Sequence, residues 1–176
     1  MAETKGKLII LCGRLMVLYK DSLKEADNEL FKRVGLHYNE LDPEGWYDTK
    51  LFALFIDKYA EASITKENAI ITLGKSMYPQ IKRMGGLPNH IKTPIDLLKY
   101  SVETFLKNHR GREVRPKKLV EAINGRVVIH GTNPYFSQKL CKGVYLGILG
   151  MYNVKNPKVV ITKGFPNVEY IITWDI

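Results

Sequence analysis

The chain has 176 residues, of which 45% are hydrophobic, and a formal net charge of +9 at pH 7. This length suits a single domain, 1–176, with a core of its own. No apolar run approaches the roughly 18 residues that a membrane-spanning helix needs. Two cysteines without metal-type spacing favour buried thiols in a reducing cytoplasm, although the sequence leaves a disulfide open.

The positive charge is concentrated in residues 107–118, where six Lys or Arg accompany the single acid Glu113. Such a run could bind an acidic partner or nucleic acid. The chain has no helix-turn-helix pattern, zinc-finger spacing or RNP-like aromatic strand, so direct nucleic-acid recognition is not expected. We interpret the run as a solvated linker between a helix and a strand.

Residues 1–110 are predicted to be helical. Apolar spacing and turn residues indicate helices at about 5–34, 48–62, 65–84 and 94–111, although the apolar start of the first segment could equally be a strand. Thr93-Pro94 with Asp96 is a strong helix start, because the threonine caps free amides and the acid complements the helix dipole. An apolar stripe on this last helix ends at His109.

Residues 111–176 are predicted to form a sheet and one helix. Residues 117–131 are two β-branched runs joined by Asn124-Gly125, which favours a tight hairpin. Residues 157–174 form a second pair that turns near Lys163-Gly164. The helix between them, 134–152, carries glycines at four- and three-residue spacing, which favours close helix packing. The expected fold is therefore α+β: a helical layer packed on a four-stranded antiparallel sheet with hairpin-helix-hairpin order.

This order of elements resembles the superfamily of haem nitric-oxide/oxygen-binding domains, 4-vinyl-reductase-type domains and TRAPP small subunits. The segments that carry the resemblance are KGKLIILCGRLMVLYKDSL, GWYDTKLFALFIDKY, LGKSMYPQIKRM, KNHRG, PYFSQKLCKGVYLGILGMY and VEYIITW. The chain is most similar to the uncharacterised non-haem bacterial and archaeal members. The resemblance implies a sensory or scaffold module that often dimerises through its helices.

The resemblance also tests the chain for haem binding. The haem-binding branch holds its cofactor with a histidine on the helix before the sheet and with a Tyr-x-Ser-x-Arg motif. Tyr135, Ser137 and Lys139 occupy the three named positions of this motif. Lysine replaces arginine there, and it lacks the planar guanidinium group that binds a carboxylate through two hydrogen bonds. Phe105 stands at the position where the haem-binding branch has its histidine, and His109 lies one turn further along the helix. His109 is either an axial ligand or a structural residue in the last turn of its helix.

No nucleophile elbow, phosphate loop or dinucleotide motif is present, so we expect a non-catalytic domain. The hypothesis is a sensory module that binds an apolar or amphipathic small molecule in a pocket between helices and sheet. Its polar end would contact Tyr135, Ser137 and Lys139, and its apolar part would contact Leu98, Val102, Phe105 and Tyr145. One alternative is a haem-based gas sensor with His109 or His90 as ligand. Another is an interaction module with a closed pocket, and in either case a homodimer or a protein partner is expected.

Overall fold

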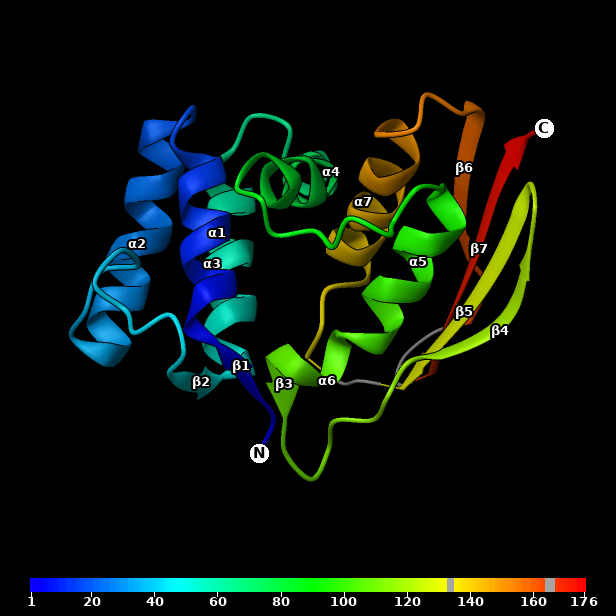
Figure 1. Ribbon diagram of the computed structural model, residues 1–176. Coiled ribbons are helices and arrows are strands. Elements are labelled where there is room, and N and C mark those ends of the chain that lie inside the picture. The colour runs from blue at the N-terminus through cyan, green and yellow to red at the C-terminus, as the bar shows by residue number, and fades with distance from the viewer. Residues whose placement is uncertain (133–134, 164–166) are drawn as a thin grey trace.

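A computed structural model describes residues 1–132, 135–163 and 167–176. Two antiparallel sheets and a set of helices confirm the expected α+β class (Figure 1). The helices are α1 Gly6–Met16, α2 Lys20–Val34, α3 Thr49–Ala62, α4 Glu67–Arg83, α5 Pro94–Glu103, α6 Phe105–Asn108 and α7 Gln138–Gly150. The strands are β1 Glu3–Lys5, β2 Trp46–Asp48, β3 His109–Arg110, β4 Lys118–Ile123, β5 Arg126–Thr132, β6 Lys155–Ile161 and β7 Asn167–Asp175.

The segment predicted as the first helix forms two helices, because the helical conformation is interrupted between Met16 and Lys20. Helix α1 buries most of its residues, whereas α2 buries only a narrow stripe that includes Ala26 and Leu30. The break lets α2 fold back beside α1 and α3 (Figure 1), which brings that stripe to the core. Gly35 ends α2 as predicted, with a left-handed φ of 71° and its N–H donated to the Phe31 carbonyl.

The last predicted helix of the N-terminal part is shorter than expected. Its start is confirmed, because Thr93 and Asp96 form a reciprocal capping box at 3.1 and 2.9 Å. The helical path ends at Asn108, and His109 is extended with φ −140° and ψ 137°. Placing His109 in a helical turn was therefore wrong. The reason is a non-local pairing, because β3 joins β1 and β2 in a small sheet in which His109 lies opposite Thr4.

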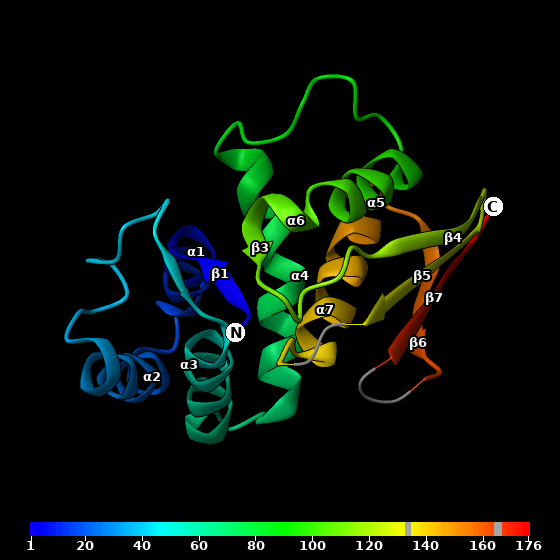
Figure 2. The same cartoon turned by 90° about the horizontal axis from the view of Figure 1, so that it is seen from below.

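The large sheet has four strands with every neighbour antiparallel, as predicted. Its strand order is β4-β5-β7-β6. Asn124-Gly125 joins β4 to β5, and Gly125 has a φ of +81°, which glycine adopts without strain. The second expected turn involves Gly164, which lies outside the described residues. Helix α7 covers one face of the sheet (Figure 2). The buried side chains of β7 alternate with partly buried ones, whereas β5 buries Val127, Val128 and Ile129 in succession.

The molecule has two main apolar cores that meet at a helix crossing. One core lies among α1–α4, and the other lies between α5, α7 and the large sheet. Helices α4 and α7 lie between these halves (Figure 2) and touch through glycines. A Cβ on Gly143 would lie 2.2 Å from the Ile71 carbonyl oxygen, and one on Gly147 would lie 2.3 Å from that of Lys75. The glycine spacing of α7 therefore serves close packing, as predicted. Among the described residues, none of the helices is long and apolar enough to cross a membrane.

The crossing makes a direct prediction for stability. Gly143→Ala should lower the free energy of unfolding by about 2–3 kcal/mol, because backbone atoms of α4 cannot move aside as a flexible side chain would. Gly150→Ala on the same helix is the control, since its Cβ meets nothing within 4 Å. It should change stability by less than about 1 kcal/mol. Urea denaturation measures both, and equal effects would contradict the crossing.

Candidate functional site

A cavity of about 140 Å³ lies where the two halves of the molecule meet. We call it the inner cavity. Its wall takes side chains from α1, α3 and α4 on one side and from α5, α6 and α7 on the other, so both halves contribute to it. The lining residues are Leu8, Phe52, Met77, Tyr78, Ile81, Ser101, Thr104, Phe105, Asn108, His109, Lys117, Phe136, Leu140, Cys141, Val144 and Tyr145.

Lys117 brings a charge into this wall. It stands just before β4, and its ammonium Nζ donates to the Tyr145 hydroxyl at 3.0 Å and lies 3.7 Å from Cys141 Sγ. The same Nζ lies 4.9, 5.3 and 6.0 Å from the ring centroids of Phe105, Tyr145 and Tyr170. No carboxylate of the described residues pairs with it. The cavity therefore holds an ammonium group surrounded by aromatic faces.

The hydroxyl groups around Lys117 are held in their neutral form. Burial raises the pKa of Tyr145, and the neighbouring Lys117 opposes the shift. Burial also raises the pKa of Tyr78, another residue of the wall. Both hydroxyls therefore remain protonated at physiological pH, so they add hydrogen-bonding capacity to the cavity without adding negative charge.

His109 is a buried, neutral ring in the wall of the inner cavity. Its Nδ1 shares a hydrogen bond of 3.0 Å with Thr4 Oγ1, which in turn bonds to Thr49 Oγ1 at 3.0 Å. The rings of Phe105 and Phe136 lie 4.4 and 4.6 Å away, centroid to centroid. Burial, followed by the charge of Lys117, lowers the pKa of His109 to about 3. The solvated linker that we predicted for residues 107–118 thus does not include His109, because the β1–β3 pairing carries it inward.

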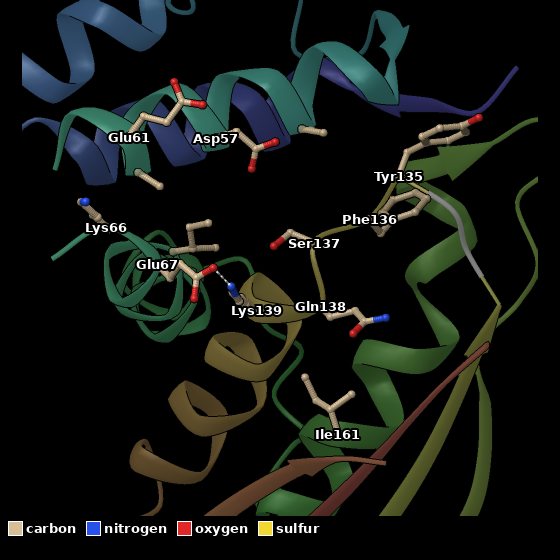
Figure 3. Close-up of a pocket in the computed structure, with 13 residues that line it drawn as sticks. Asp57, Glu61, Lys66, Glu67, Tyr135, Phe136, Ser137, Gln138, Lys139 and Ile161 are labelled. Atoms are coloured by element: carbon tan, nitrogen blue, oxygen red, sulfur yellow. Dashed lines mark ion pairs between the residues drawn. The ribbon is translucent and has the colours of Figure 1, made fainter. Parts of the chain in front are cut away.

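The residues that we expected to bind the polar end of a ligand line a second pocket. Tyr135, Ser137 and Lys139 line an open pocket of about 780 Å³, the outer pocket, beside Asp57 and Glu61 of α3 (Figure 3).

Two of these groups already have partners. The Ser137 hydroxyl accepts the Leu140 N–H at 3.2 Å as the N-cap of α7, and Lys139 forms an ion pair with Glu67. The surrounding acids and this ion pair make the outer pocket a poor place for a ligand carboxylate.

The seven predicted contact residues are thus distributed over three places. Phe105 and Tyr145 line the inner cavity, whereas Tyr135, Ser137 and Lys139 line the outer pocket. Phe136 contributes to both walls. The remaining two, Leu98 and Val102, belong to the core between α5 and the large sheet and line neither hollow.

Sequence reasoning missed Lys117 and Asn108 as cavity residues. Both lie in the basic run 107–118, which we interpreted as solvated. That interpretation holds for exposed neighbours such as Arg112 and Lys118, but not for the enclosed ammonium of Lys117. Nothing in the local pattern separates these lysines, because their positions depend on how the chain enters β4.

The residues of the inner cavity do not fit a haem as they stand. Pockets for drug-sized and cofactor ligands usually measure roughly 300–1,000 Å³, whereas this cavity measures about 140 Å³ and contains the Lys117 ammonium. The candidate propionate ligands Ser137 and Lys139 line the other hollow. Among the described residues, no three His, Cys, Asp or Glu side chains form a metal cluster.

Comparison with known proteins identifies the fold. No family model and no curated protein matches the chain. Solved H-NOX structures do match it: that of Fe(II) unliganded H-NOX from K. algicida has a TM-score of 0.69 at 14% identity, covering 98% of this chain and 97% of that one. A mutant of T. tengcongensis H-NOX gives 0.70 at 13% identity, covering 98% of each chain.

A third structure, titled for haem distortion in the H-NOX family, gives a TM-score of 0.71 at 12% identity, covering 98% of this chain and 95% of that one. These comparisons confirm that the chain has the fold of haem nitric-oxide/oxygen-binding domains, one of the three groups that the sequence resembles. The 4-vinyl-reductase and TRAPP parts stay predictions.

The neutral His109 predicts how stability depends on pH. Its folded pKa lies below that of the unfolded chain, so the unfolded state binds more protons between about pH 6.5 and 3. The stabilising contribution is complete above pH 6.5 and is lost as the pH falls through this window. When the pH is lowered from 7 to 5, the protonation of His109 in the unfolded chain should lower the free energy of unfolding of the wild type by about 2 kcal/mol.

Urea denaturation at pH 7 and pH 5 measures this loss, and His109→Phe should remove it. Ionised carboxylates contribute equally to both proteins, so the difference isolates the imidazole. His90→Gln serves as the control, because His90 is exposed and should leave the pH dependence unchanged. The same loss in His109→Phe would show that the ring is not buried as a neutral group.

Proposed function

We propose that this chain is a non-catalytic sensory domain that binds a small molecule in the inner cavity. The observation that carries the proposal is the position of the cavity, whose wall comes from both halves of the molecule. A ligand bound there contacts both halves and therefore favours one relative arrangement of them over others. That dependence is what a sensory domain needs to pass binding on to a partner.

The chemistry of the wall supports binding more than catalysis. His109 is the imidazole of the wall, and its Nδ1 is already bonded to Thr4. No Asp or Glu lines the cavity among the described residues, so the usual partner of a catalytic base is absent there. Apolar side chains with a few polar groups are typical of ligand sites.

Two variants separate the inner cavity from the outer pocket. Cys141→Met places a longer side chain inside the inner cavity, whereas Lys139→Ala changes only the outer pocket. Native mass spectrometry of untreated wild-type protein should show a bound small molecule. We expect Cys141→Met to lose it and Lys139→Ala to keep it. The opposite result would place the ligand at Tyr135, Ser137 and Lys139.

A second candidate is a haem-based gas sensor, because the structures that share the fold are H-NOX proteins, and one of them comes from work on haem distortion in H-NOX proteins. At the level of the fold, the comparisons favour this candidate over a general ligand domain. The buried neutral His109 is the available axial ligand. Haem binding would require the side chains around the inner cavity to move apart.

Haem titration tests this second candidate. It predicts a Soret band that His109→Ala removes and His90→Ala retains. A titration without such a band in the wild type would retire haem as the ligand while leaving the inner cavity open to a smaller guest. A homodimer or protein partner stays a prediction, which the mass distribution at several concentrations checks.

A further inference from the structure

The ammonium of Lys117 is the one cation in the wall of the inner cavity, within the part of the chain that the structure describes. An enclosed cation is unfavourable unless charge or hydrogen bonds compensate it. Three aromatic faces offset part of this cost. An ammonium group has three donors. Tyr145 takes one at 3.0 Å, and Cys141, at 3.7 Å, is a weak acceptor for a second.

A polar atom in the same wall has no partner among the described residues. This atom is the buried Oδ1 of Asn108. The amide nitrogen of the same side chain donates to the Thr104 carbonyl at 3.4 Å. Buried acceptors are rarely left unpaired in folded proteins. Asn108 therefore indicates a donor on the guest, just as Lys117 indicates an acceptor.

The size and charge of the inner cavity limit the guest further. A volume of about 140 Å³ is close to the ~150 Å³ of an apolar cavity that accepts benzene. His109 is neutral, since burial and the charge of Lys117 lower its pKa to about 3. One cation therefore faces the guest, which suits a monoanion better than a doubly charged phosphate. Leu8, Met77 and Val144 supply an apolar surface for the rest of the molecule.

Building on the function proposed above, we propose that the inner cavity binds a small carboxylate whose single benzene ring also carries a hydroxyl group. The carboxylate accepts from Lys117 Nζ, the hydroxyl donates to Asn108 Oδ1, and the ring lies among the apolar side chains. Lys117 thus selects the charge of the ligand, and the volume of the cavity selects its size.

Isothermal titration calorimetry of the full chain tests the charge with matched probes. Benzoate and benzamide have nearly the same shape, but only benzoate is an anion. Wild-type protein should bind benzoate at least about tenfold more tightly than benzamide, because a hydrogen bond to a charged group outweighs a neutral one. Equal affinities would overturn the role of Lys117 without the use of any variant.

Lys117→Met assigns that preference to one residue. It should weaken benzoate about 10- to 100-fold and change the affinity for phenol by less than about threefold. The control is Lys118→Met, since Lys118 is the adjacent and exposed lysine. It should leave both affinities unchanged. Circular dichroism checks the fold of each variant, and should Lys117→Met not fold, the benzoate–benzamide comparison decides.

The hydroxyl is tested with the three hydroxybenzoate isomers. At least one isomer should bind more tightly than benzoate, and Asn108→Leu should remove that advantage. Binding of phenol or benzamide without binding of any carboxylate would overturn the ligand class but leave the proposed site standing. If none of the probes binds while a different molecule is found by native mass spectrometry, the ligand class again fails alone. No binding in either experiment would overturn both proposals.

Discussion

The contact between α4 and α7 is the constraint on which the arrangement of the molecule depends. At Gly74, Gly143 and Gly147 no side chain separates the two helices, so each backbone lies against the other. On a neighbouring face of the same two helices, Met77 and Val144 carry full side chains and line the inner cavity. The two halves are therefore held together at the crossing and stand apart beside it. The cavity lies beside the glycine contact between α4 and α7.

A single positive charge then determines the chemistry of that space. The ammonium of Lys117 repels a proton on His109, which adds to the effect of burial and keeps the imidazole neutral. It also donates to the neutral hydroxyl of Tyr145. The wall consequently offers one full charge, several hydrogen-bonding groups and apolar rings. In the ligand site that we propose, such a wall would distinguish small molecules by charge and by size.

Local signals in the sequence predict most of the fold. The hairpin at Asn124-Gly125, the capping box at Thr93 and the close packing of α7 are each encoded within a few residues, and each is confirmed. The small sheet escaped prediction, because His109 and its partner Thr4 are 105 residues apart and neither strand has a local pattern of its own. The site depends on this non-local pairing and on the path of Lys117 into β4, so composition alone could not reveal it.

The position of Phe105 connects the fold with the chemistry of the inner cavity. By the sequence resemblance, this residue stands where the haem-binding branch carries its axial histidine. Here its ring instead faces the Lys117 ammonium at 4.9 Å and lies 4.4 Å from His109. A haem in the inner cavity would take the space that the Lys117 side chain now fills. It would also separate the Lys117 ammonium from the aromatic rings that face it. The chain thus has the fold of the H-NOX structures, while its own side chains place an ammonium group in a cavity of about 140 Å³.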